Sequence, residues 1–201
     1  MVRMVRIGLL CMICVSLFSS ETARAQTVND EGLWFAFITN GDIARRGSNF
    51  DRLKWRFEGH ARFLDDAGGF NQGIIRPALG WQVNEQTSVF AGYDWIPNLP
   101  ARGEEFIEHR SWQQLGWSRS FDPLTLALRS RLEQRFLDTG DDMGWRFRQL
   151  FRVQHDLPNS RHFTLVGWDE VFFHLNDTDF GARAGFDQNR VFVGLGLKGR
   201  P

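Results

Sequence analysis

Cysteine is almost absent from this chain of 201 residues, and the two that occur, Cys11 and Cys14, both lie near its start. No cysteine follows residue 25, which excludes disulfides, thiolate catalysis and cysteine-ligated metals from the rest of the protein. The histidines do not have the spacing of a metal motif such as H-x-x-x-H. We therefore expect no metal and no other cofactor.

Lysine is equally scarce, because Lys54 and Lys198 are the only two among 24 basic residues and all the others are arginine. Arginine is preferred where a planar guanidinium must pair with carboxylates in a confined space, although genomic base composition gives the same bias. The whole chain has 24 basic and 24 acidic residues, and the part after residue 25 has 21 and 23. This balance excludes nucleic-acid binding driven by bulk charge.

Long hydrophobic runs are missing too, so no segment is a candidate transmembrane helix. The apolar stretch at residues 7–19 has 13 residues, whereas a membrane-spanning helix needs roughly 20. Arg3 and Arg6 precede this stretch and Ala23-Arg24-Ala25 follows it, which is the pattern of a secretory signal peptide. We therefore predict a signal peptide at residues 1–25, cleaved after Ala25, and one exported domain at residues 26–201. An uncleaved anchor is the alternative.

What the chain has instead is alternation with a period of two residues, which predicts β-strands with two different faces. In residues 122–136 the arginines and Glu133 fall on one face and all four leucines on the other. A helix would scatter these arginines around its circumference, whereas a strand gathers them. Residues 145–154 and 53–63 alternate in the same way. The prediction totals about nine strands. The less regular ones are residues 33–39, 72–83, 87–95, 106–118, 162–174 and 184–197.

The predicted connections are short at one end of the sheet and mostly longer at the other, which is typical of an outer-membrane barrel. We therefore predict an all-β fold, an antiparallel up-and-down transmembrane β-barrel of about 10–12 strands in its complete form. Residues 198–201 resemble a turn and not a final strand, so we expect one or more C-terminal strands to be missing here. Tight turns are predicted at residues 84–85, 122–123 and 156–159, and longer loops at residues 64–71, 96–105, 137–144 and 176–183.

The same alternation also fits a soluble barrel with its apolar face inside. Strands of about 10–14 residues favour the membrane, since crossing needs roughly 9–11 and strands of soluble proteins usually have about 5–6. We expect a monomer in the outer membrane, with lipid and the outer-membrane assembly machinery as partners. A soluble periplasmic barrel that binds a small apolar ligand is the alternative. Tryptophans near predicted strand ends, where a membrane interface favours them, are Trp34, Trp81, Trp95, Trp117 and Trp145.

The charged strand at residues 129–135 reads R-S-R-L-E-Q-R, which resembles the R-x-R-x-E-x-R core of the DUF2490 family, a set of bacterial proteins of undefined function. The resemblance implies an outer-membrane, barrel-like domain and no known activity. Further pieces match in the same order over most of the exported part: Gly92-Tyr93, Glu108-His109-Arg110, Arg146-Phe147-Arg148, Glu170, Gln188-Asn189-Arg190 and Gly194.

The strongest candidate site is a network of ion pairs between residues that face the lumen. On adjacent strands of one orientation, arginines and glutamates can form bidentate pairs across the lumen. One interpretation is a plug of ion pairs that fills a narrow barrel. The other is a basic lumen that binds or passes a small anionic solute, because arginine outnumbers glutamate on this face. The predicted network comprises Arg56, Glu58, Arg62, Glu108, Arg110, Arg129, Arg131, Glu133, Arg135, Arg146, Arg148, Glu170 and Arg190.

A lipid hydrolase is a third hypothesis, although we expect no enzyme. His109 and Ser111 share one face of a predicted strand, and Glu108 or Glu133 is a candidate to orient a histidine. Acyl transfer needs a hydrogen bond between the nucleophile and its base, together with donors for the oxyanion. Two residues on one strand face establish neither.

Overall fold

The computed structural model describes residues 7–8, 32–44, 47–48, 50–64, 69–100, 103–158 and 162–197. Apart from residues 7–8, the predicted signal peptide lies outside these ranges, together with its cleavage site and both cysteines. Residues 198–201, for which the sequence predicts a turn, lie outside them as well.

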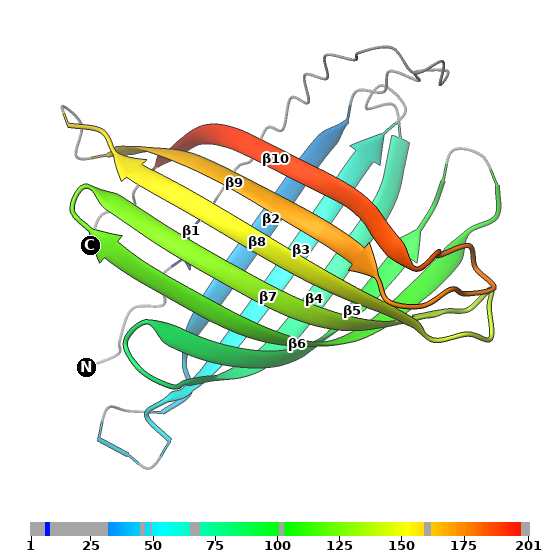
Figure 1. The fold of residues 1–201 in the computed structure, drawn as a ribbon, viewed down its shortest axis with the longest axis horizontal. Helices are drawn as coiled ribbons and strands as arrows, with labels where there is room; N and C mark the ends of the chain where they lie inside the picture. Colours follow the sequence, from blue (N-terminus) through cyan, green and yellow to red (C-terminus); the bar gives the residue numbers. More distant parts are fainter. Residues whose placement is uncertain are drawn as a thin grey trace.

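The described chain forms one antiparallel sheet of nine long strands with a two-residue strand at its edge (Figure 1). Each strand pairs with the next one along the chain, so the predicted up-and-down topology is confirmed. The nine strands predicted from the alternation are confirmed as well, with ends displaced by a few residues. In chain order the strands are β1 (Ile7–Gly8), β2 (Leu33–Asp42), β3 (Leu53–Leu64), β4 (Gly69–Gln82), β5 (Thr87–Asn98), β6 (Phe106–Phe121), β7 (Leu124–Leu137), β8 (Gly144–Asp156), β9 (Phe163–His174) and β10 (Gly185–Leu197).

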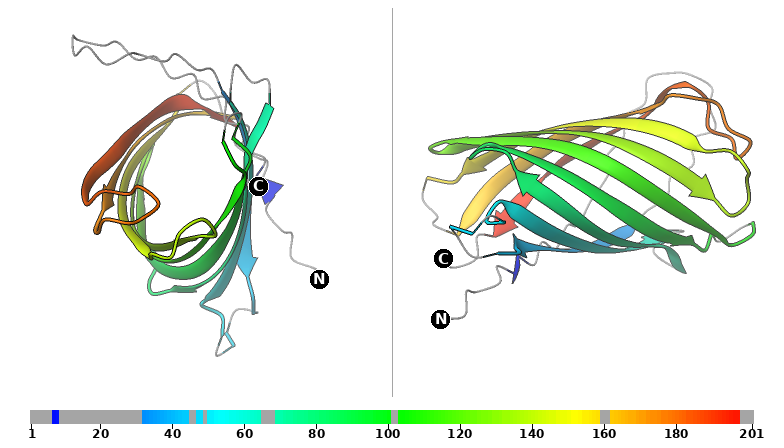
Figure 2. Two further views of the ribbon diagram at one scale, coloured as in Figure 1. Left: turned by 90° about the vertical axis from the view of Figure 1, so that its right-hand side faces the viewer. Right: turned by 90° about the horizontal axis from the view of Figure 1, so that it is seen from below.

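The sheet curls round on itself without closing, as the end-on view of Figure 2 shows, with β2 and β10 near its two ends. Every pairing from β2 to β10 is antiparallel, so β10 runs in the same direction as β2. An antiparallel barrel closes with an even number of strands, and nine strands cannot satisfy this. Among the described residues β10 pairs only with β9, and the predicted lack of closure is confirmed.

The two faces of the curled sheet differ sharply in polarity. Leu79, Leu115 and Val193 point outward and are 59%, 51% and 72% exposed. On the inner face, Arg131 and Glu133 in β7 are 1% and 0% exposed. Because side chains alternate along a strand, one sequence pattern places the apolar residues outside and the charged residues inside.

The outer face also carries a few polar side chains, which satisfy one another. Gln113 in β6 and Gln134 in β7 exchange two amide hydrogen bonds, both of 3.1 Å. Ser130 donates to Gln149 over 2.6 Å. Removing polar groups from water costs little free energy when they are hydrogen-bonded in this way.

The connections at the two ends of the sheet follow the predicted sizes only in part. One end has the connections 83–86, 122–123 and 157–162, together with the long connection 43–52. The connection 65–68 lies at the opposite end and is as short as 83–86, although the sequence predicts a longer loop at residues 64–71. At this opposite end, the connections 138–143 and 175–184 hold each other in place. Asp179 accepts a hydrogen bond from the Asp141 backbone N–H, and Asp142 accepts one from the Asp179 N–H, each over 2.7 Å.

No helix among the described residues is long and apolar enough to cross a membrane.

Candidate functional site: an arginine-rich cavity inside the barrel

The register of the strands lines up charged residues in one row along the inner wall. Glu58 in β3 lies opposite Arg76 in β4, and the register between β4 and β5 places Arg76 opposite Asp94. Asp94 lies opposite Arg110 in β6, and Arg110 lies opposite Arg135 in β7. Residues directly opposite one another have Cβ atoms about 4.5–5.5 Å apart, so neighbours of opposite charge in the row are within reach of ion pairing. Arg110 and Arg135 have the same charge, and both pair with Glu108.

Arg76 is held by two carboxylates. Its Nε and Nη2 atoms donate to the two oxygens of Asp94 over 2.7 and 2.8 Å, and its Nη1 donates to Glu58 over 2.7 Å. Asp94 also accepts a hydrogen bond of 2.6 Å from the indole N–H of Trp112. All four side chains are buried. This arrangement meets the requirement that buried charges are paired and hydrogen-bonded.

Glu133 is the hub of a second group of ion pairs. Its Oε2 accepts hydrogen bonds from Nε and Nη2 of Arg146, over 2.9 and 2.6 Å, and its Oε1 accepts one of 2.7 Å from Arg148. Guanidinium nitrogens of Arg131 and Arg110 lie 3.8 and 3.9 Å from the same carboxylate. One carboxylate therefore faces four arginines.

Two further glutamates continue the network on either side of this hub. Glu170 accepts two hydrogen bonds from Arg148, both of 2.9 Å, and one of 2.8 Å from Arg129. Glu108 accepts two from Arg110, both of 2.7 Å, and another from Arg135. The inner face of β6 to β9 thus forms a continuous lattice of guanidinium–carboxylate contacts.

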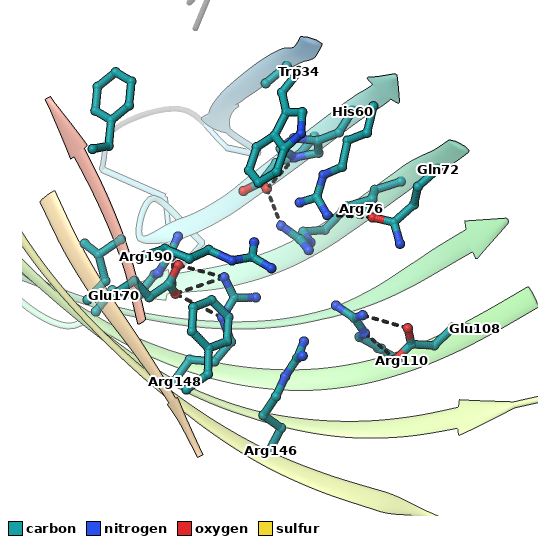
Figure 3. Close-up of a pocket in the computed structure, with 18 of the residues that line it drawn as sticks. Trp34, His60, Gln72, Arg76, Glu108, Arg110, Arg146, Arg148, Glu170 and Arg190 are labelled. Atoms are coloured by element: carbon teal, nitrogen blue, oxygen red, sulfur yellow. Dashed lines mark hydrogen bonds and ion pairs between the residues drawn. The ribbon is translucent and has the colours of Figure 1, made fainter. Parts of the chain in front are cut away.

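The lattice does not fill the whole interior of the barrel. A cavity of about 850 Å³ remains beside it. In Figure 3, Trp34, His60 and Gln72 approach this space from one side, and Arg148, Glu170 and Arg190 from the other. Nine arginines but only three glutamates line the cavity. Since arginine stays protonated in proteins, the cavity wall carries excess positive charge.

Three of the nine arginines have no carboxylate within ion-pair distance in the described part of the chain. Arg62 donates to Gln72 over 2.6 Å, Arg152 to Gln154 over 3.0 Å, and Arg190 to Gln188 over 3.0 Å. Their partners are neutral amides, so the charges of these arginines are not neutralised locally. The other six cavity arginines each pair with a glutamate or aspartate: Arg76, Arg110, Arg129, Arg135, Arg146 and Arg148.

The thirteen residues that the sequence assigned to the network all lie on the inner face, and eleven of them make ion-pair contacts. Within the described part of the chain, Arg62 and Arg190 are the two that do not. Arg131 does not line the cavity; it stacks on Trp112, with 4.1 Å from its guanidinium carbon to the ring centroid, and donates to Gln114. The eleven are Arg56, Glu58, Glu108, Arg110, Arg129, Arg131, Glu133, Arg135, Arg146, Arg148 and Glu170.

Sequence reasoning missed Asp94 and misplaced Trp34. The alternation of residues 89–96 puts Asp94 on the face opposite Tyr93 and Trp95, and this parity is a signal from which it could have been assigned to the network. Trp34 was expected at a membrane interface because it lies near a strand end. In the structure it lines the cavity, and the guanidinium of Arg62 lies 4.5 Å from its ring centroid.

The residues proposed for a lipid hydrolase do not come together. His109 contacts the hydroxyl of Tyr93 on the outer face, and Ser111 donates to Gln134 over 2.8 Å and not to the histidine. Glu108 and Glu133 point inward, on the opposite side of the barrel wall. Across the described ranges, no three His, Cys, Asp or Glu side chains are grouped so that they could hold a metal ion.

Comparisons with known proteins give a family but no activity. The family described as a protein of unknown function, DUF2490, matches residues 31–201. An uncharacterised protein of Methylorubrum extorquens is 35% identical over 202 aligned positions, which cover 98% of this chain and 83% of that protein. No solved structure matches the chain significantly.

Proposed function

Because this chain belongs to the DUF2490 family, whose description assigns no activity, we propose a function from the interior of the barrel: it is an outer-membrane protein that binds small anions in its arginine-rich cavity. The proposal is for a binding or transport protein and not for an enzyme.

The observation that carries this proposal is the imbalance of charge around the cavity. A lattice that served only to fill the barrel would neutralise its own arginines, since an unpaired buried charge is costly. Arg62, Arg152 and Arg190 instead face the cavity, and none of them has a carboxylate partner among the described residues. Positive charge at a concave, poorly solvated wall concentrates anions, and arginine side chains line many anion pathways.

The interpretation of the network as a plug accounts for a different part of the interior. Ala78 in β4, Phe90 in β5 and Trp112 in β6 form a buried apolar cluster. Arg131 packs on Trp112 of this cluster, and neither Arg131 nor Glu133 lines the cavity. We therefore assign a structural role to this filled part and a binding role to the cavity.

Equilibrium binding of radiolabelled phosphate to the purified protein in a non-ionic detergent tests the proposal. We expect saturable binding that weakens with salt, because screening reduces the attraction between charges. Arg152→Gln should weaken binding, whereas Arg183→Gln should not, since the Arg183 side chain is 81% exposed in a loop. If phosphate does not bind saturably, or if both variants bind it like the wild type, the anion-binding function is wrong.

The apolar outer face supports the membrane location, because extended apolar surface is rarely left exposed to water. Ala127→Cys and Leu128→Cys place single thiols on opposite faces of β7, and no other cysteine follows residue 25. In the membrane, Leu128→Cys should react with a lipid-phase label and be protected from a water-soluble one, while Ala127→Cys should not react from the lipid. Release of the protein with the periplasm, with Leu128→Cys open to the water-soluble reagent, would support the soluble alternative.

A further inference from the structure

We propose that the cavity takes an acidic amphiphile, whose carboxylate or phosphate head group binds Arg62 and Arg190 and whose apolar chain leaves through the seam between β2 and β10. This inference rests on the proposed anion-binding function and names the class of ligand. The seam is the line along which β2 and β10 face each other across the open side of the sheet, and β1 pairs with the β2 side of it at Ile38 and Thr39.

Arg62 and Arg190 converge from opposite sides of the seam onto one aromatic ring. The guanidinium carbon of Arg62 in β3 lies 4.5 Å from the ring centroid of Trp34, and that of Arg190 in β10 lies 5.6 Å from it. Trp34 is in β2, so this contact joins the two ends of the sheet. Such cation–π contacts hold guanidinium groups in place without neutralising them.

The two arginines are oriented but retain free donors. Each makes one side-chain hydrogen bond among the described residues, Arg62 to Gln72 and Arg190 to Gln188. Gln72 is itself fixed, because it donates its amide N–H to Asn98. A guanidinium has five N–H donors, so most of those on Arg62 and Arg190 remain available to an oxyanion.

The wall beside these arginines is apolar. Phe172, Phe192 and Val166 are buried and line the same cavity. The guanidinium of Arg190 lies 4.8 Å from the ring centroid of Phe172. A ligand whose head group binds Arg190 therefore has apolar surface within reach of its chain. A volume of about 850 Å³ lies within the usual range for small-molecule sites, about 300–1,000 Å³.

The cavity continues through the seam onto the outer face. Phe35 in β2 and Leu195 in β10 both line it, although they belong to the outward faces of their strands and are 50% and 67% exposed. No described strand pairs with the Leu195 edge of β10. The apolar chain of a ligand whose head group binds Arg62 and Arg190 can thus pass between the strands to the apolar exterior. An inorganic anion has no chain that could use this path.

Three probes separate the contributions of charge and chain: decanoate has both, acetate has only the head group, and decanol has only the chain. We expect the whole protein in non-ionic detergent to bind decanoate about tenfold or more tightly than either of the others, and Arg62→Gln/Arg190→Gln to lose this advantage, as expected for lost charge-assisted hydrogen bonds. Arg183→Gln is the matched control. Partitioning into detergent is the same for every variant, so differences between variants report the site.

The outcomes distinguish the two proposals. Acetate binding as tightly as decanoate would overturn the amphiphile and leave the anion-binding function standing. Decanol binding as tightly as decanoate in both the wild type and the double variant would overturn the role of Arg62 and Arg190 in holding the amphiphile, whereas the anion-binding function fails only if phosphate does not bind as described above. Loss of folding is a poor explanation for weaker binding, because neither arginine neutralises a carboxylate of the described ranges and each glutamine keeps a polar side chain. An unchanged far-ultraviolet circular dichroism spectrum of Arg62→Gln/Arg190→Gln checks this directly, whereas tryptophan fluorescence would respond to the lost contacts with Trp34.

A second measurement locates the apolar chain of the bound ligand. With Leu195→Cys as the only cysteine after residue 25, decanoate should slow its reaction with a maleimide, and decanol should not at the same concentration. Equal protection by the two, or none by decanoate, would contradict the proposed path through the seam.

Discussion

Arg76 and Asp94 form a bidentate ion pair across β4 and β5, with Nε–Oδ1 and Nη2–Oδ2 distances of 2.7 and 2.8 Å. Asp94 is completely buried and also accepts the indole N–H of Trp112. This one carboxylate therefore connects the row of ion pairs to the apolar cluster of the filled interior. Two parallel hydrogen bonds of this kind are among the strongest that a side chain makes.

Removing this carboxylate should be strongly destabilising. We expect Asp94→Ala to lower the free energy of unfolding by about 3–5 kcal/mol, because it leaves Arg76 buried with only Glu58 as a partner. Urea titration in lipid vesicles, followed by tryptophan fluorescence, measures the loss. Arg183→Ala, which removes an exposed ion pair, should cost no more than about 1 kcal/mol. Equal effects of the two substitutions would show that the buried pair has no special role.

Glu133 and Arg146 should be energetically coupled. Glu133→Gln leaves four arginines facing a neutral amide, and the additional change Arg146→Gln removes one of the repelling charges. The double variant should therefore be less destabilised than the sum of the single variants, with a coupling free energy of about 1–3 kcal/mol in a double-mutant cycle. A parallel cycle on the exposed pair Arg183–Asp177 should give less than about 1 kcal/mol. Additive effects at Glu133 and Arg146 would contradict the hub.

A charge on the outer face distinguishes the membrane from water. Leu115 lies near the middle of β6 and is 51% exposed. Leu115→Arg should cost about 2–4 kcal/mol if this position faces the centre of a bilayer, and Phe121→Arg, at the end of the same strand, about 0–1 kcal/mol. Unfolding titrations in vesicles measure both. In a soluble barrel an exposed leucine tolerates arginine, so two small effects would argue against the membrane.

Gly92 is required by the close approach of Trp112. A Cβ atom at Gly92 would lie 2.3 Å from Cζ2 of Trp112 and 2.8 Å from the Pro77 carbonyl oxygen. Trp112 is fully buried, so it has no space to move aside. We expect Gly92→Ala to destabilise the protein by about 1–3 kcal/mol through overpacking, with a change in tryptophan fluorescence.

Gly167→Ala is the control for this substitution, because the nearest atom to its added Cβ is 3.8 Å away. It should leave stability and fluorescence almost unchanged. If the two alanine variants behave alike, the contact between Gly92 and Trp112 does not limit packing in the filled interior.

The sequence predicted the charged face of the barrel well because the signal was local. In β7, Arg129, Arg131 and Glu133 follow one another at every second position, and a strand places such residues on one face whatever its neighbours are. The same logic, applied to residues 89–96, would have placed Asp94 inside. It was overlooked because a single carboxylate among aromatic residues makes no repeating pattern.

Alternation in the sequence therefore determined the strands, their up-and-down order and the separation of a charged face from an apolar one. Only the tertiary structure decided which face is inside, since the alternation of apolar and charged residues is the same whether the charged face points inward or outward. It also decided which arginines pair, because register across neighbouring strands brings Arg76 to Asp94 and leaves Arg62 and Arg190 with amides. The contact of Arg190 with Trp34 joins residues 156 positions apart in the chain. Curling of the sheet creates that contact, and no local pattern in the sequence records it.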